Sequence, residues 1–126
     1  NHKLPLGHSA MKINHNMPKF IVNELEKKYN LKTKTIGLLG LAFKAETDDI
    51  RDSLAIDLKK ILEKKKIKTL VSDEYYKSKD NINKNVLIKR SDIIILSTPH
   101  KIYKKLKIKK NKILIDIWGF FESKKN

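Results

Sequence analysis

The sequence of 126 residues contains no cysteine. This absence excludes a disulfide scaffold, a thiolate zinc site and a cysteine nucleophile within the chain. A reducing cytoplasm is the simplest setting for such a chain, so we expect a cytoplasmic protein. The sequence also lacks a methionine at its first position, which we interpret as the sign of a fragment or a processed chain.

Long hydrophobic runs are absent as well. There is no stretch of about 18 uninterrupted apolar residues, so we expect no transmembrane helix and no membrane partner. The first residues, "NHKLPLGHSAMK", lack the continuous apolar segment of a secretory signal. The hydrophobic content of 40% is nevertheless enough for a core, and the length fits one domain, or a small domain plus an extra element.

Arginine is scarce in a chain that is strongly basic. The net charge is +15 and Lys and Arg together number 29, yet only Arg51 and Arg90 are arginines. Specific nucleic-acid readers favour arginine for bidentate base contacts and use aromatic side chains for stacking, and neither pattern is present here. We therefore expect a lysine-solvated surface and no specific nucleic-acid partner, with nonspecific attraction of polyanions left open.

Apolar residues recur at three- and four-residue spacing through residues 4–29, which predicts an amphipathic helix. The residues that form this stripe are Ala10, Ile13, Met17, Ile21 and Leu25. Pro18 is expected to kink or break the helix near residues 16–17. The helix has few obvious partners within the chain, so we expect its apolar face to cover another domain or another chain.

Apolar strands alternate with helical segments after residue 35. Strands are predicted at 35–40, 67–73, 93–97 and 111–119, with a helix over 53–65 and a short helix or strand near 86–88. Ser53 is a good N-cap for the longer helix. Continuous apolar strands of this kind predict an α/β fold: a Rossmann-like open parallel sheet with helices on both faces, preceded by the long N-terminal helix.

Ligands of such sheets bind at the carboxyl ends of the strands. The connection after the first strand, within "GLLGLAFKAETDDIRDS", has two glycines but lacks the three-glycine dinucleotide fingerprint. Lys44 could neutralise a diphosphate, Phe43 could cover a base, ribose or sugar, and Arg51 could bind an anion bidentately. The alternative is a structural glycine with acidic residues that cap the next helix.

Three other residues follow predicted strands. Asp73 lies where a dinucleotide-binding domain has its ribose-binding carboxylate, but we favour a turn-forming role because the glycine fingerprint is missing. His100 could act as an acid or base, but no partner carboxylate is identifiable, so we favour a loop-structural role. Trp118 either stacks on a ligand or covers the edge of the core. No metal site is expected, because His2, His8 and His15 lack a metal-binding spacing.

Four stretches resemble the C-terminal domain of the UDP-glucose/GDP-mannose dehydrogenase family, in the family's order: "AMKINHNMP", "IGLLGLAFKAETDDIRDS", "SDIIILSTPHKIY" and "ILIDIWG". Members are NAD-dependent enzymes that oxidise the C6 alcohol of a nucleotide sugar twice to a uronate. The resemblance implies that residues 1–30 are the end of the central dimerisation helical region. Residues 31–126 would be the C-terminal UDP-sugar-binding α/β domain.

The resemblance also implies roles for individual residues. Phe43 and Lys44 would contact the UDP-sugar, and Arg51 would reach an NAD bound mainly by a missing N-terminal domain. The catalytic Cys and Lys of the family lie in the central region, so this chain would hold no catalytic residue and would be inactive alone. Its expected partners are the missing NAD-binding and catalytic domains and a second copy, bound through the N-terminal helix as a homodimer.

Trp118 marks a departure from one branch of that family. UDP-glucose members usually have an arginine at this position, where it helps to bind UDP, so the tryptophan fits better with the branch that acts on UDP-N-acetylhexosamines. "INHNMP" also resembles that branch, which includes UDP-N-acetylmannosamine dehydrogenase. The substrate is therefore expected to be a UDP-N-acetylhexosamine or UDP-glucose. The alternative is a non-catalytic α/β module that binds a nucleotide or a polyanion.

Overall fold

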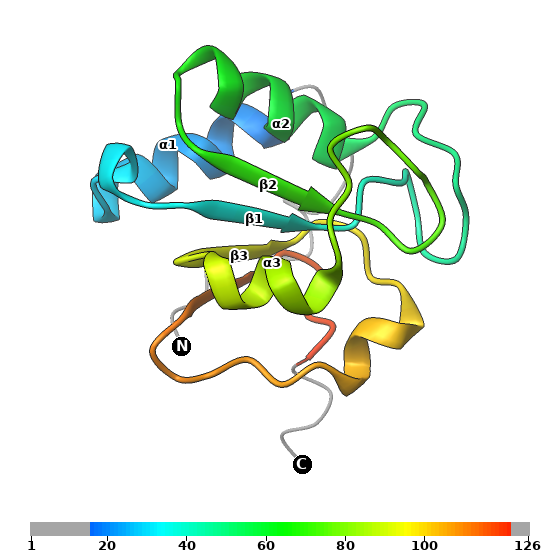
Figure 1. The fold of residues 1–126 in the computed structure, drawn as a ribbon. Helices are drawn as coiled ribbons and strands as arrows, with labels where there is room; N and C mark the ends of the chain where they lie inside the picture. Colours follow the sequence, from blue (N-terminus) through cyan, green and yellow to red (C-terminus); the bar gives the residue numbers. More distant parts are fainter. Residues whose placement is uncertain (1–15, 122–126) are drawn as a thin grey trace.

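The computed structural model describes residues 16–121 as an open α/β sheet with helices packed against it (Figure 1). The elements in chain order are α1 (Met17–Lys28), η2 (Leu31–Thr33), β1 (Ile36–Leu39), α2 (Leu54–Lys64), β2 (Thr69–Ser72), α3 (Lys84–Arg90), β3 (Ile93–Leu96), η3 (Lys101–Lys105) and β4 (Ile113–Asp116). The elements η2 and η3 are short 3₁₀ helices.

The four strands form one sheet in the order β2-β1-β3-β4, and every neighbouring pair is parallel. Ile36 of β1 pairs with Thr69 of β2 on one side and with Ile93 of β3 on the other. All residues of β1 and β3 are buried, because these central strands are covered on both faces. The predicted open parallel sheet is confirmed.

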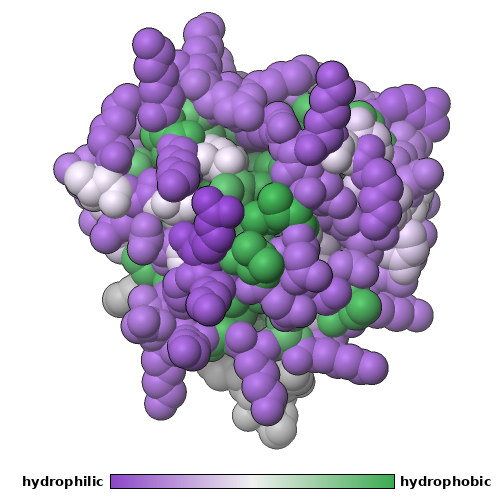
Figure 2. All heavy atoms as spheres, in the orientation of Figure 1, coloured by the Kyte–Doolittle hydropathy of each residue, from purple (hydrophilic) through white to green (hydrophobic). Residues whose placement is uncertain are grey.

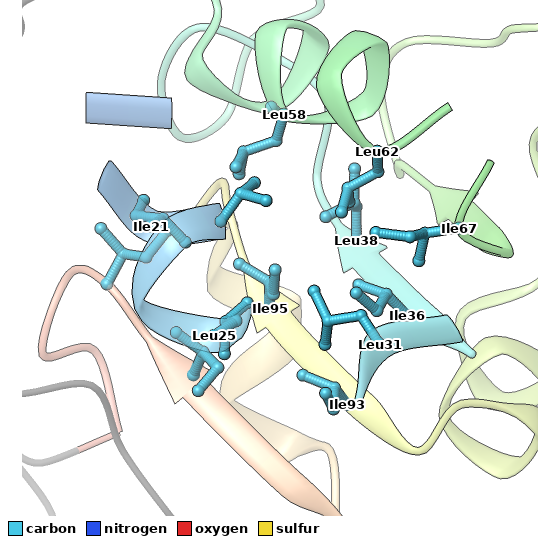
Figure 3. Packing of buried hydrophobic residues seen from close by; sticks show 14 of the residues in the cluster. Ile21, Leu25, Leu31, Ile36, Leu38, Leu58, Leu62, Ile67, Ile93 and Ile95 are labelled. Atoms are coloured by element: carbon cyan, nitrogen blue, oxygen red, sulfur yellow. The ribbon is translucent and has the colours of Figure 1, made fainter. Parts of the chain in front are cut away.

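The larger core lies between one face of the sheet and the helices α1 and α2 (Figure 3). Figure 3 shows side chains from the two helices and two central strands directed toward one another: Ile21, Leu25, Leu58, Leu62, Ile36, Leu38, Ile93 and Ile95. A second cluster covers the opposite face and includes Leu87 and Ile88 of α3 and Tyr103 of η3. Helices therefore cover both faces, as predicted.

The helix α1 packs into the domain core rather than standing apart from it. Ile21, Val22 and Leu25 have no exposed surface, and they share one cluster with residues of α2, β1 and β3. The expectation that this helix has few partners within the chain is therefore wrong for the part described. Pro18 lies in the first turn of α1, where a missing N–H costs no intrahelical hydrogen bond. Residues 4–15 of the predicted helix lie outside the described residues.

Local sequence features explain where α2 begins and how closely α3 packs on the sheet. Ser53 caps α2 as predicted, since its Oγ accepts a hydrogen bond from the Ile56 N–H at 3.3 Å. The segment near 86–88 is the helix α3. This helix lies so close to β1 that a Cβ at Gly37 would be 2.3 Å from Ser91 Oγ and 2.5 Å from Leu87 Cδ2. Gly37 thus serves helix–sheet packing.

Hydrophilic side chains cover most of the face seen in Figure 2, with a small group of hydrophobic side chains near its middle. This arrangement agrees with a lysine-solvated surface. Across residues 16–121, no helix has both the length and the apolar character needed to cross a membrane.

Candidate functional site

Three loops meet at the carboxyl edge of the sheet, after β1, β2 and β3. Because β1 lies between β2 and β3, the loop that follows it is flanked by the other two. Figure 1 shows the β1–α2 loop and the loop after β2 extending from the same end of the sheet. The predicted location of a ligand site, at this edge, is therefore occupied by the segment that carries Phe43, Lys44 and Arg51.

Gly40 is required where β1 ends. Its φ of +96° lies in the region that side chains disfavour, and a Cβ there would lie 2.3 Å from Thr98 Cβ. The Thr98 hydroxyl also donates to the Ala42 carbonyl at 2.8 Å. The glycine therefore allows the β1 and β3 loops to approach each other, which is the structural role that the sequence left open.

Phe43 and Lys44 lie on a loop that folds back on itself. The Phe43 N–H donates to the Asp49 carbonyl at 2.6 Å, which closes the segment 43–49. The Phe43 side chain is half-buried, and Lys44 is exposed. The loop therefore carries an exposed lysine directly after a half-buried aromatic residue.

Arg51 forms a bidentate ion pair with Asp49. Its Nε donates to Asp49 Oδ1 at 3.0 Å and its Nη2 donates to Asp49 Oδ2 at 2.8 Å. These bonds, with the Arg51 N–H and a smaller contribution from Lys44, lower the pKa of Asp49 to about 2. The pKa of Arg51 is raised by the same pair. Asp49 is thus the ion-pair partner of Arg51, and Lys44 adds only a weaker electrostatic effect.

Asp73 is buried at the end of β2 and accepts five hydrogen bonds. One oxygen, Oδ1, accepts from the N–H groups of Tyr75 and Tyr76 at 2.7 and 2.8 Å, which forms a turn. The other, Oδ2, accepts from the N–H groups of Leu41 and Ala42 at 2.5 and 3.1 Å, and from His100. The turn-forming interpretation is confirmed, and both carboxylate oxygens are used within the fold.

Burial alone would raise the pKa of Asp73, but the hydrogen bonds more than offset it. The bond from His100 and the N–H groups of Tyr76, Leu41 and Tyr75 stabilise the charged form and lower the pKa to about 2. The carboxylate is therefore ionised throughout the physiological pH range.

The partner that the sequence did not reveal for His100 is Asp73. The two side chains are fully buried, with His100 Nε2 3.0 Å from Asp73 Oδ2. They are 27 residues apart, and only the strand order β2-β1-β3 brings them to opposite sides of the same loop. Their shared position directly after predicted parallel strands is the sequence signal that could have paired them.

Glu46 was also missed. Its N–H donates to His100 Nδ1 at 2.9 Å, and its carboxylate accepts from the Tyr75 hydroxyl at 2.7 Å and the Lys101 N–H at 2.6 Å. The Lys101 and Tyr75 bonds lower the pKa of Glu46. An exposed glutamate in a charged loop has no feature that predicts these contacts from the sequence.

Trp118 follows β4 and lies at the same edge of the sheet. Its Nε1 donates to the Ser97 carbonyl at 3.0 Å, and its half-buried ring packs against the larger core. The indole therefore covers the end of the core between β3 and β4. Its predicted contact with a substrate stays a prediction. Nearby, the Asp116 carboxylate accepts from the Phe120 and Phe121 N–H groups and forms a turn.

No group of three or more His, Cys, Asp or Glu side chains within residues 16–121 is arranged to hold a metal ion. Of the four histidines, His2, His8 and His15 lie outside the described residues.

A four-stranded parallel sheet with its long loops at the carboxyl edge defines a Rossmann-like α/β domain. Comparison with known families narrows this class. Residues 37–123 match the UDP-glucose/GDP-mannose dehydrogenase family, UDP binding domain, and the chain belongs to this family. The family resemblance of the sequence motifs is confirmed.

Relatives and solved structures agree with this assignment. The UDP-N-acetyl-D-mannosamine dehydrogenase of Pyrococcus horikoshii is 31% identical over 119 residues, which cover 85% of this chain and 28% of the relative. The NDP-N-acetyl-D-galactosaminuronic acid dehydrogenase of Ralstonia nicotianae is 25% identical over 128 aligned positions, covering 93% of this chain and 30% of the relative. This chain therefore spans less than a third of the length of these curated relatives.

The fold is shared with a solved structure of the UDP-N-acetyl-mannosamine dehydrogenase from Staphylococcus aureus. The TM-score is 0.74 at 22% identity, over 85% of this chain and 28% of that one. At this identity the likeness establishes the fold alone.

Proposed function

We propose that this chain binds the UDP part of a UDP-sugar through the loop after β1. The observation that carries the proposal is the family match over residues 37–123, which includes this loop at the carboxyl edge of the sheet. Lys44 supplies a positive charge for the diphosphate, and the half-buried Phe43 ring beside it offers an apolar surface for the sugar or the nucleoside.

The whole protein is proposed to be an NAD-dependent UDP-sugar 6-dehydrogenase that oxidises its substrate twice to a uronate. NAD, when bound, accepts the hydride. The residue of this chain that would contact it is Arg51, whose side chain is 88% exposed. The bidentate pair with the Asp49 carboxylate holds this exposed guanidinium on the loop, which supports a role in binding an oxyanion of the cofactor.

The proposed substrate is a UDP-N-acetylhexosamine, with UDP-glucose as the competing choice. Trp118 supports the former, because its indole is packed against the core where UDP-glucose members have an arginine. The family relatives named as UDP-N-acetyl-D-mannosamine dehydrogenases, from Campylobacter jejuni and P. horikoshii, support the same branch.

We also propose where this domain lies within the whole protein and in which compartment the protein acts. Residues 1–30 would form the end of a central helical region through which the protein dimerises, and the enzyme would act in the cytoplasm. NAD would be bound mainly by an N-terminal domain, and the catalytic residues would lie in the central region. This cysteine-free chain alone is therefore expected to produce no NADH.

Calorimetric titration of the chain with UDP, UDP-glucose, UDP-N-acetylmannosamine and GDP-mannose tests the site. We expect weak binding of the uridine nucleotides, and Lys44→Ala is expected to raise the Kd for UDP by about tenfold, because a charge-assisted contact is lost. Lys60→Ala on α2, an equally exposed lysine away from the loop, is the control and should change little. Equal UDP binding by Lys44→Ala and the unmodified chain would refute the assignment.

A further inference from the structure

The segment that carries Phe43 and Lys44 is bracketed by backbone groups that are bonded to two buried side chains. On the N-terminal side, the N–H groups of Leu41 and Ala42 donate to Asp73 Oδ2. On the C-terminal side, the Glu46 N–H donates to His100 Nδ1 at 2.9 Å. Only three residues, 43–45, lie between these two attachments.

The hydrogen-bond partners define the state of His100. Because Nδ1 accepts the Glu46 N–H, this nitrogen carries no proton, and the proton of the neutral imidazole is on Nε2. Nε2 therefore donates to Asp73 Oδ2 at 3.0 Å. One chain of hydrogen bonds thus runs from the backbone of residues 41–42 through Asp73 and His100 to the backbone of Glu46.

Further contacts hold each side chain in this series of hydrogen bonds. The Asp73 carboxylate is also bonded to the turn after β2, and the His100 ring contacts the rings of Tyr75 and Tyr103, with centroids 4.7 and 5.4 Å away. The Glu46 carboxylate accepts the Lys101 N–H, which follows His100 directly. These groups leave the imidazole no rotation that would keep both of its hydrogen bonds.

Because Asp73 and His100 are buried, neither side chain can contact a ligand directly. Neither side chain is accessible to solvent, and every oxygen of Asp73 is bonded inside the fold. A catalytic acid or base has to reach the substrate, so the pair acts on a ligand only through the loop that it holds.

We propose that Asp73 and His100 are positioning residues for the candidate UDP-sugar loop. They fix the backbone on both sides of Phe43 and Lys44, so that the positions from which these two side chains project are set before the nucleotide binds. Preorganisation of this kind raises affinity because the loop does not have to be ordered on binding. The inference rests on the proposed function.

Two variants of His100 test separately its hydrogen bond with Asp73 and its hydrogen bond with the Glu46 N–H. His100→Gln places an amide near the Nε2 position, so it can still donate to Asp73 but leaves the Glu46 N–H without an acceptor. His100→Asn places an oxygen near the Nδ1 position and loses the donor to Asp73. Ser97→Ala is the control, since it removes buried hydrogen bonds to the Leu39 and Gly40 carbonyls at the same sheet edge without contacting residues 41–46.

Hydrogen exchange of the Phe43 and Glu46 amides is the first measurement. In His100→Gln we expect both amides to exchange about tenfold faster or more, and the Kd for UDP to rise about tenfold. His100→Asn should retain the protection of the Glu46 amide. Ser97→Ala should change neither amide relative to the amides of β1. The inference is overturned if the Phe43 amide exchanges at the same rate in His100→Gln as in the unmodified chain. It is also overturned if both amides exchange faster in His100→Gln while the Kd for UDP is unchanged.

The nitrogen NMR signals of His100 in the unmodified chain provide a test that needs no variant to fold. The inference requires a protonated Nε2 and an unprotonated Nδ1 at neutral pH, and the opposite tautomer would overturn it. If the unmodified chain binds no UDP, the proposed function fails. The exchange rates would then still decide whether the Asp73–His100 pair fixes the loop.

Discussion

Both carboxylate oxygens of Asp73 form their hydrogen bonds within the fold. The position after the second strand of a Rossmann-like sheet is the place where a carboxylate can bind a ribose. Here both oxygens are occupied by N–H groups and by His100, so the carboxylate joins three loops instead. The charge therefore contributes to stability, and this contribution depends on pH.

The first prediction concerns acid unfolding. The pKa of Asp73 is lowered from 3.8 to about 2 in the folded chain, so the folded state binds fewer protons than the unfolded state between these values. The stabilisation is complete above the unfolded pKa and is lost as the pH falls through the folded pKa, with a size of about 2 kcal/mol. Urea unfolding of the chain and of Asp73→Asn, followed from pH 7 to below the folded pKa, measures it.

The difference in stability between the two proteins should be largest at neutral pH and should shrink as the pH falls through this window. Ser97→Ala, which removes buried hydrogen bonds without removing a titratable group, is the control and should show no such narrowing. A constant difference between Asp73→Asn and the unmodified chain over the whole range would contradict the role of the Asp73 charge.

At the scale of the elements, α1 belongs to the core of the α/β domain as described. Its buried face is made by residues with no exposed surface, and these pack against α2 and the sheet (Figure 3). An exposed aromatic residue, Phe20, remains on the other side of the helix, with 42% of its surface accessible. Within the described residues, the helix therefore has one face buried in the domain and another that is exposed.

The second prediction follows from these two faces. Leu25→Ala removes a fully buried side chain and should lower the free energy of unfolding by about 3 kcal/mol through the cavity that it leaves. Phe20→Ala on the same helix should cost under about 1 kcal/mol. Denaturant unfolding at two protein concentrations measures both effects and separates them from dimerisation. An unchanged stability of Leu25→Ala at low concentration would show that α1 does not support the domain core.

The elements themselves were largely predictable, for local reasons. The strands are continuous apolar runs, and Ser53 is a recognisable cap, so both follow from residue type and spacing. The segment near 86–88 stayed ambiguous because α3 is only seven residues long and its neighbours are polar. The position of Asp73 and His100 after predicted parallel strands was the one signal for their pairing, but it was not enough by itself, because the contact depends on which strands are neighbours. The contact of His100 with Glu46 had no such signal.

For the whole molecule, the net charge of +15 raises the question of polyanion binding. Hydrophilic side chains dominate the face seen in Figure 2, and 29 residues of the chain are Lys or Arg, while a diphosphate bound at the proposed site would contact few of these cations. Nonspecific and specific binding of anions should therefore differ in their response to salt, because DNA releases condensed counterions for each phosphate contacted, whereas a single diphosphate is affected by ionic screening alone.

The third prediction uses this difference. Between about 50 and 200 mM salt, the affinity for duplex DNA should fall by about 1,000-fold or more, whereas the affinity for a UDP-sugar should fall only by about fourfold. Titrations of the same protein with both ligands, with Lys44→Ala as the site variant, measure the two slopes. A UDP-sugar slope as steep as that of DNA would contradict a localised site and favour a general polyanion-binding module.

The burial of Asp73 also limits how this scaffold can be re-engineered. Restoring a three-glycine turn after β1 would not by itself create an adenine-dinucleotide pocket, because the carboxylate at the end of β2 already accepts five internal donors. Releasing it would detach the neighbouring loops from one another. In this chain, converting the specificity from one nucleotide to another would mean rebuilding the connections of three loops rather than changing one motif.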